Sequence, residues 1–184
     1  MIKKTPVEAW VRSRMKLGPH DVLTREKLLE FQLGLLSETL SRVRTHSPFY
    51  RKKLAGFPQR PLDGPDDLQA LPFTTEEDLR EEHLNLLAVS QDQIARVVTL
   101  QTSGTTARPK RVYFTDGDIE QSVDFFHHGI TTLVEPGQKV LVLMPGPALG
   151  SVGDILSKGL ARMGATGIVH RSEERRVGKE CRSR

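Results

Sequence analysis

The feature that most constrains the fold is a change in the hydrophobic pattern at Ile94. Beyond this residue, short β-branched and aliphatic runs alternate with longer segments whose apolar residues recur at three- and four-residue steps. Such alternation is typical of an α/β fold in which parallel strands are joined by helical crossovers. The expected strands are 94–101, 110–115, 138–145 and 166–170, and the expected helices are 115–134 and 151–165.

The strand and helix pattern stops at His170. The last fourteen residues, 171–184, hold six Lys or Arg and three Asp or Glu, and Val177 is their one aliphatic residue. Nothing in this segment would add an element that closes the layer, so we expect the β-α-β-α-β sheet to be incomplete. We expect 171–184 to be non-native sequence or, as the alternative, a natural disordered basic tail.

A long helix is expected ahead of these strands. Leucine and other apolar residues recur at helical spacing over 25–46, and Thr24 is a suitable N-cap with Glu26 in the first turn. Ser47 and Pro48 follow and end this helix, because the residue before a proline is biased away from the helical region. The predicted fold therefore begins with helices and continues into the incomplete sheet.

Two shorter helical segments flank the long helix. Apolar residues at helical spacing indicate an amphipathic segment within 1–20. After a proline-rich connection, Thr74 or Thr75 is expected to cap a short helix that starts at Glu76 and Glu77. The expected divisions of the chain are an N-terminal segment over 1–20, a domain over 21–170 and the tail over 171–184.

Composition and charge argue against several classes of protein. The net charge is +4, but outside the basic tail 21 basic residues face 20 acidic ones, so no nucleic-acid partner is expected. No apolar run approaches the roughly 20 residues that span a bilayer, and no secretory signal opens the chain, so a cytoplasmic location is expected. The one cysteine, Cys181, and six scattered histidines have no ligand spacing, so no metal site is predicted. The sequence does not indicate an oligomeric state.

The segment 101–110, QTSGTTARPK, is the strongest candidate for a binding site. Gly104 allows a sharp turn and a close approach of the backbone to a ligand, and successive amides in such a turn form a nest for phosphate oxygens. Pro109 fixes the backbone just before Lys110, whose positive charge can lie along phosphates. The alternative interpretation is a solvent-exposed hairpin connection between the two strands. The hydroxyl groups that could donate further hydrogen bonds are those of Thr102, Ser103, Thr105 and Thr106.

The order of residues in 102–110 resembles the signature loop of the adenylate-forming superfamily, the acyl-CoA synthetases and related ligases. The chain departs from that loop at Ala107, where glycine is usual, and alanine narrows the dihedral angles available there. Two further segments, 47–56 and 71–81, look like the opening of the phenylacetate-CoA ligase branch. The residues that match the signature loop are Thr102, Ser103, Gly104, Thr105, Thr106, Pro109 and Lys110.

The resemblance implies that 21–170 is the N-terminal part of an AMP-binding ligase domain. The parent enzyme would activate a small-molecule carboxylic acid with ATP and Mg²⁺, form an acyl-adenylate and pass the acyl group to coenzyme A. Lys110 would offset the charge of the β- and γ-phosphates. The residues that would grip these phosphates are Thr102, Ser103, Gly104, Thr105 and Thr106.

The family motifs that carry most of the chemistry are not found in this sequence. We therefore assign no catalytic residue and expect that this chain alone does not complete adenylation. Two other hypotheses remain open at the level of sequence. One is a stand-alone, non-catalytic module that binds nucleotide or phosphate, and the other is a basic interaction protein that acts through the tail.

Overall fold

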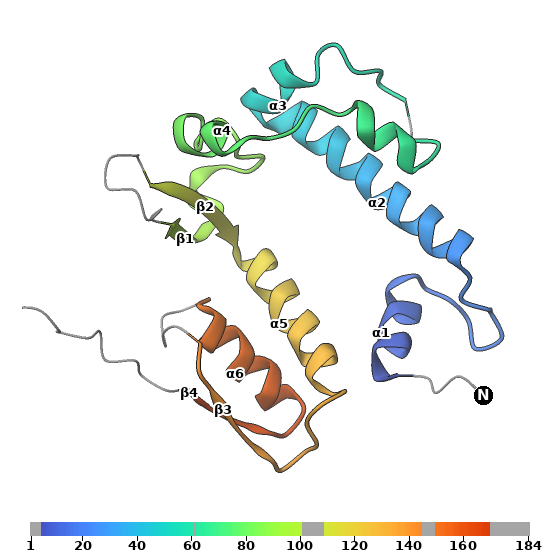
Figure 1. Cartoon of the computed structure of the whole chain (residues 1–184), viewed down its shortest axis with the longest axis vertical. Coiled ribbons are helices and arrows are strands. Elements are labelled where there is room, and N and C mark those ends of the chain that lie inside the picture. Colours follow the sequence, from blue (N-terminus) through green and yellow to red (C-terminus); the bar gives the residue numbers. More distant parts are fainter. Residues whose placement is uncertain (1–4, 61, 101–108, 145–149, 170–184) are drawn as a thin grey trace, which may run out of the picture. The chain divides into compact units, whose positions relative to one another are not determined.

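The computed structural model describes residues 5–60, 62–100, 109–144 and 150–169. The chain forms two compact units. Figure 1 shows the helices and strands coloured along the sequence. We call Arg12–Asp116 the hairpin unit, and Met1–Val11 with Gly117–Arg184 the crossover unit. The tail 171–184 lies outside the described residues.

The longest helix has the boundaries that its capping residues predict. Helix α2 covers Arg25–His46, and the Thr24 side chain accepts a hydrogen bond from the backbone nitrogen of Lys27 at 3.3 Å. This bond satisfies one of the amide groups that the first turn of a helix leaves free. The prediction of both the helix and its cap is confirmed. A shorter helix, α1, precedes it over Pro6–Arg14.

Ser47 separates α2 from the next helix, α3, which covers Pro48–Lys53. Its side chain is completely buried. The hydroxyl group donates to the backbone oxygen of Asn85 at 2.8 Å and accepts from the backbone nitrogen of Tyr50 at 3.3 Å. One small side chain therefore caps α3 and also ties it to the segment that follows α4.

The short helix α4, Glu76–Glu81, starts as the sequence predicts. Thr75 and Asp78 form a capping box, in which each side chain accepts a hydrogen bond from the other residue's backbone nitrogen, at 3.2 and 2.8 Å. This reciprocal arrangement fixes the first turn of α4 in one orientation. Two short 3-10 helices, η1 over Pro65–Ala70 and η2 over Gln91–Gln93, complete the connections.

The strands of the hairpin unit form an antiparallel pair. Strand β1, Ile94–Leu100, pairs with β2, Lys110–Thr115, and the register ends with Leu100 opposite Lys110. The sequence predicts parallel crossovers where helices join the strands, and a hairpin connection is one of the two interpretations of the segment between these two strands. The connection between these two strands is shorter than the dozen or more residues that a parallel crossover needs, so they form a hairpin.

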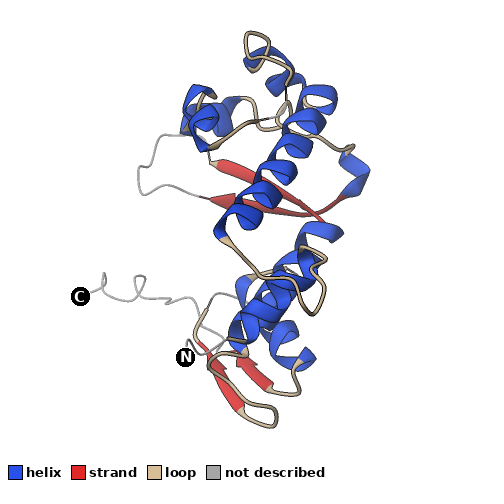
Figure 2. Ribbon diagram, turned by 90° about the vertical axis from the view of Figure 1, so that its right-hand side faces the viewer, coloured by secondary structure: helices blue, strands red, loops and turns tan. Residues whose placement is uncertain are grey.

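The crossover unit contains the predicted strand-helix-strand arrangement. Strand β3, Lys139–Val142, lies parallel to β4, Thr166–Val169, and helix α6, Val152–Arg162, connects them. Helix α5, Asp116–Ile130, precedes this arrangement. Figure 2, with strands in red, shows one strand pair in each unit. The core of the crossover unit consists of Val142, Leu160 and Ala165, packed with Ile130, Val134, Val140, Leu156, Met163 and Val169.

Trp10 packs against helix α5. Its indole nitrogen donates to a carboxylate oxygen of Asp124 at 2.9 Å, and its ring stacks on His128 with centroids 5.4 Å apart. Phe125 meets the same ring edge to face at 6.1 Å. These aromatic and imidazole side chains therefore serve the packing of the crossover unit in this structure.

The α/β class, with N-terminal helices followed by an incomplete sheet, is confirmed. The structure adds that the described strands pair as two separate two-stranded sheets. Among the described residues, no helix combines the length and apolar character needed to cross a bilayer.

Candidate functional site

The β1–β2 hairpin presents the candidate phosphate loop. Because Leu100 faces Lys110 in the last register pair, residues 101–109 connect two adjacent strand ends. Lys110 is the first residue of β2 and follows the loop directly. Among the predicted site residues, Thr102, Ser103, Gly104, Thr105 and Thr106 lie outside the described residues, and the structure places Lys110.

Lys110 lies against the first turn of α4. Its ammonium group forms an ion pair with Oε1 of Glu76, and the Lys110 side chain is 22% exposed. The same oxygen accepts a hydrogen bond from Nη2 of Arg80 at 2.7 Å. Two cations therefore share one carboxylate oxygen.

The electrostatic consequence appears at the shared carboxylate. The hydrogen bond from Lys110 holds the pKa of Glu76 below its ordinary value, and the charges of Arg80 and Lys110 act in the same direction. Glu77 also approaches Arg80, at 3.9 Å, but its side chain is 72% exposed. The cluster thus contains two cationic and two anionic side chains, of which Glu76 contacts both cations.

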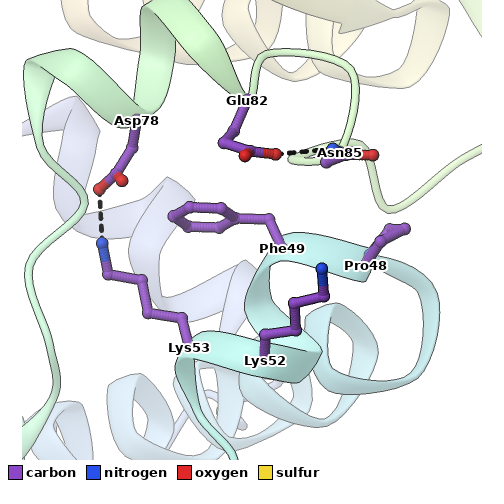
Figure 3. A pocket seen from close by; sticks show the side chains of 7 residues that line it. All are labelled: Pro48, Phe49, Lys52, Lys53, Asp78, Glu82 and Asn85. Carbon is purple, nitrogen blue, oxygen red and sulfur yellow. Dashed lines mark hydrogen bonds and ion pairs between the residues drawn. The ribbon is translucent and has the colours of Figure 1, made fainter.

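Helix α4 is attached to α3 on another side. Asp78 accepts a hydrogen bond from the ammonium group of Lys53, which lies 4.8 Å from the centroid of the Phe49 ring. This bond lowers the pKa of Asp78, and the backbone hydrogen bond from Thr75 lowers it further. Figure 3 shows the Lys53–Asp78 pair spanning the space between the two helices, with Phe49 beside it.

A cavity of about 470 Å³ lies between α3 and the α4 segment (Figure 3). The segments 47–56 and 71–81 carry the family resemblance, and their spacing in the sequence does not indicate a cavity. Lys52 and Lys53, three and four residues after Phe49, are the one local signal of a polar lining. The lining residues are Pro48, Phe49, Lys52, Lys53, Asp78, Glu82 and Asn85.

A second contact holds the α4 segment against β2. Nδ1 of His83 and the hydroxyl group of Tyr113 are 2.6 Å apart, and the two rings stack with centroids 5.9 Å apart at 15°. With the pair formed by Glu76 and Lys110, this contact fixes the α4 segment at two positions along β2. The base of the candidate loop is therefore part of a packed arrangement of helix and strand.

No family model matches this sequence. The phenylacetate-coenzyme A ligase of Thermus thermophilus is 37% identical over 103 residues, which is 54% of this chain and 23% of that enzyme. This chain is related to the adenylate-forming ligases. The resemblance stated from the signature loop is thus confirmed.

Solved structures of adenylate-forming ligases share the fold. A crystal structure of 2-hydroxyisobutyryl-CoA ligase in an open conformation, in complex with 2-HIB-AMP and CoA, has a TM-score of 0.68 at 22% identity, and covers 86% of this chain and 40% of that chain. The same ligase in the thioesterification state has a TM-score of 0.66 at 24% identity, with 83% and 35% covered. The chain spans less than half the length of each of these relatives.

Proposed function

We propose that this chain is part of an ATP-dependent carboxylate-CoA ligase that forms an acyl-adenylate, and that 102–110 holds the phosphates of ATP. The observation that carries this proposal is the position of Lys110. The antiparallel register places it at the base of the loop, opposite Leu100. Hydroxyl and amide donors in 102–106 would then face the same polyphosphate as the Lys110 ammonium group.

The charges near the base of the loop fit a polyphosphate ligand. Lys110 and Arg80 are 22% and 18% exposed, so both cations are partly removed from solvent screening. ATP would supply the phosphoanhydride whose cleavage activates the carboxylate. Lys110 would stabilise the negative charge on the departing pyrophosphate. Mg²⁺ is usually held by phosphates, waters and one or two carboxylates, so we propose that it enters with ATP.

The acyl acceptor and the extent of the reaction are also part of the proposal. The relatives named above are CoA ligases, and we propose coenzyme A as the acceptor and a small carboxylic acid as the substrate. This chain covers 40% and 35% of the two solved structures that contain the acyl-adenylate and CoA. We propose that 21–170 contributes the phosphate-binding part, and that this chain alone binds ATP without completing adenylation.

Calorimetric titration of the full chain with Mg·ATP tests the proposal. We expect measurable affinity in the unmodified protein and a loss of about tenfold or more in Lys110→Met, because a charged hydrogen bond to phosphate is removed. Lys139→Met is the matched control, since Lys139 also opens a strand but lies at the start of β3. Absence of Mg·ATP binding, or an equal loss in both variants, would contradict the proposal.

A further inference from the structure

Glu76 occupies the position on Lys110 that a phosphate would need. The Lys110 ammonium group is bound to Oε1 of this carboxylate, and both groups are anchored in regular structure. A carboxylate and a polyphosphate carry the same sign of charge and would compete for this ammonium group. The arrangement therefore contains an internal competitor for the ligand of the proposed function.

The position of Glu76 is fixed by the rest of α4. The capping box of Thr75 and Asp78 sets the first turn, and Lys53 of α3 binds Asp78. His83, just beyond α4, binds Tyr113 of β2. These contacts hold α4 in place against α3 and β2. The position of Glu76 beside Lys110 is therefore set by the packing of the hairpin unit.

Arg80 provides a second partner for the carboxylate. It lies four residues after Glu76 on the same face of α4, and its Nη2 is 2.7 Å from the oxygen that Lys110 also contacts. If Lys110 turns to a phosphate, Glu76 keeps one cation and does not become an unpaired charge. The exchange therefore leaves each charged side chain with a partner of opposite sign.

We propose that Glu76 is a latch that holds the Lys110 ammonium group on α4 until a polyphosphate displaces the carboxylate. This inference rests on the proposed function of 102–110 and adds a positioning residue to it. The latch acts through Lys110. The hydrogen bond that lowers the pKa of Glu76 keeps the carboxylate charged and supports the assignment.

The decisive comparison is between two neighbouring glutamates. Glu76→Gln removes the charge that Lys110 contacts, whereas Glu77→Gln removes an equal charge that lies 3.9 Å from Arg80 and is 72% exposed. In titrations of the full chain with Mg·ATP, we expect Glu76→Gln to bind about two- to fivefold more tightly, the range of a partly exposed ion pair. Glu77→Gln should leave the affinity within error of the unmodified protein.

A double-variant cycle separates the latch from a general charge effect. In the Lys110→Met background, Glu76→Gln should produce no gain in affinity, because the group that it releases is absent. A second measurement is independent of ATP: acylation of the Lys110 amine by a succinimidyl ester, followed by peptide mass spectrometry. The acylation rate should rise in Glu76→Gln and stay unchanged in Glu77→Gln, since only the first substitution uncovers this amine.

The outcomes distinguish the latch from the proposed function. If the unmodified protein binds Mg·ATP and the two glutamine variants bind equally well, the latch is overturned and the phosphate site stands. A gain in Glu76→Gln that persists without the Lys110 amine also overturns the latch. If none of the variants binds Mg·ATP, both proposals are overturned. Binding that is detected in Glu76→Gln and is weaker in the unmodified protein supports both.

Discussion

The contact between helices α5 and α6 depends on the absence of a side chain at Gly159. A Cβ atom on this residue would lie 3.0 Å from the backbone nitrogen of His127 and 3.4 Å from two atoms of Phe126. The nearest of these atoms belongs to the backbone of α5, which has no rotamer to change. Gly159→Ala should therefore push α6 away from α5 by a few tenths of an ångström.

Two effects of opposite sign determine the change in the free energy of unfolding. Alanine is more favourable than glycine in a helix interior by about 1 kcal/mol. Overpacking a closely packed contact costs about 1–3 kcal/mol. The clash involves backbone, and the next residue, Leu160, is only 1% exposed, so the steric cost should lie in the upper part of this range. We expect a net loss of about 1–2 kcal/mol for Gly159→Ala.

Urea unfolding followed by tryptophan fluorescence measures this effect. The one tryptophan of the sequence, Trp10, packs on α5 and therefore reports on the unit that contains Gly159. Gly129→Ala in α5 is the matched control, because a Cβ there would meet nothing within 4 Å. This control should be neutral or gain up to about 1 kcal/mol. Equal stabilisation by both substitutions would refute the close contact between the helices.

Two further predictions concern the contacts around α3 and α4. Ser47→Ala should lower the free energy of unfolding by about 1–2 kcal/mol, because the completely buried Ser47 hydroxyl group caps α3 and donates to the carbonyl of Asn85. Urea unfolding followed by circular dichroism measures this loss. The pKa values of Glu76 and Asp78 are lower in the folded protein than in the unfolded chain, so both carboxylates contribute to the free energy of unfolding. This contribution is complete above the ordinary carboxyl pKa, about 4, and is lost as the pH falls through the lowered pKa values. Thermal unfolding across pH should show this loss, and Asp78→Asn should flatten the profile.

The boundaries of the helices could be predicted because their signals are local. The Thr24 hydroxyl group accepts from an amide three residues further on, and the capping box of Thr75 and Asp78 spans the same distance. Each signal depends on residues within one helical turn of each other in the sequence, so periodicity and capping rules are enough to predict these helix starts. Two features differ from expectation. Helix α3 begins at Pro48, where the chain was expected to leave the helical conformation. The described strands, expected in one β-α-β-α-β sheet, pair as two separate two-stranded sheets.

The candidate phosphate loop was also identified from local sequence, through the order of residues in 102–110. The side chains that surround Lys110 could not be identified in this way. The sequence predicts Glu76 only as the start of a short helix, and no property of the segment 76–81 by itself indicates a partner on β2. The cavity beside Phe49 could likewise not be predicted from the sequence, because its lining comes from helices α3 and α4, which are separate in the sequence.

The sequence by itself determined where α2 and α4 begin, which runs become strands, and that a hydroxyl-rich segment precedes a lysine. Tertiary structure decided which distant polar and charged groups contact one another. Lys53 and Asp78 are 25 residues apart, His83 and Tyr113 are 30 apart, and Ser47 and Asn85 are 38 apart. Capping and periodicity act over a few residues and leave a trace in the local order of side chains. The partner of a distant ammonium or hydroxyl group depends on how separate elements pack, because packing alone brings those groups within hydrogen-bonding distance.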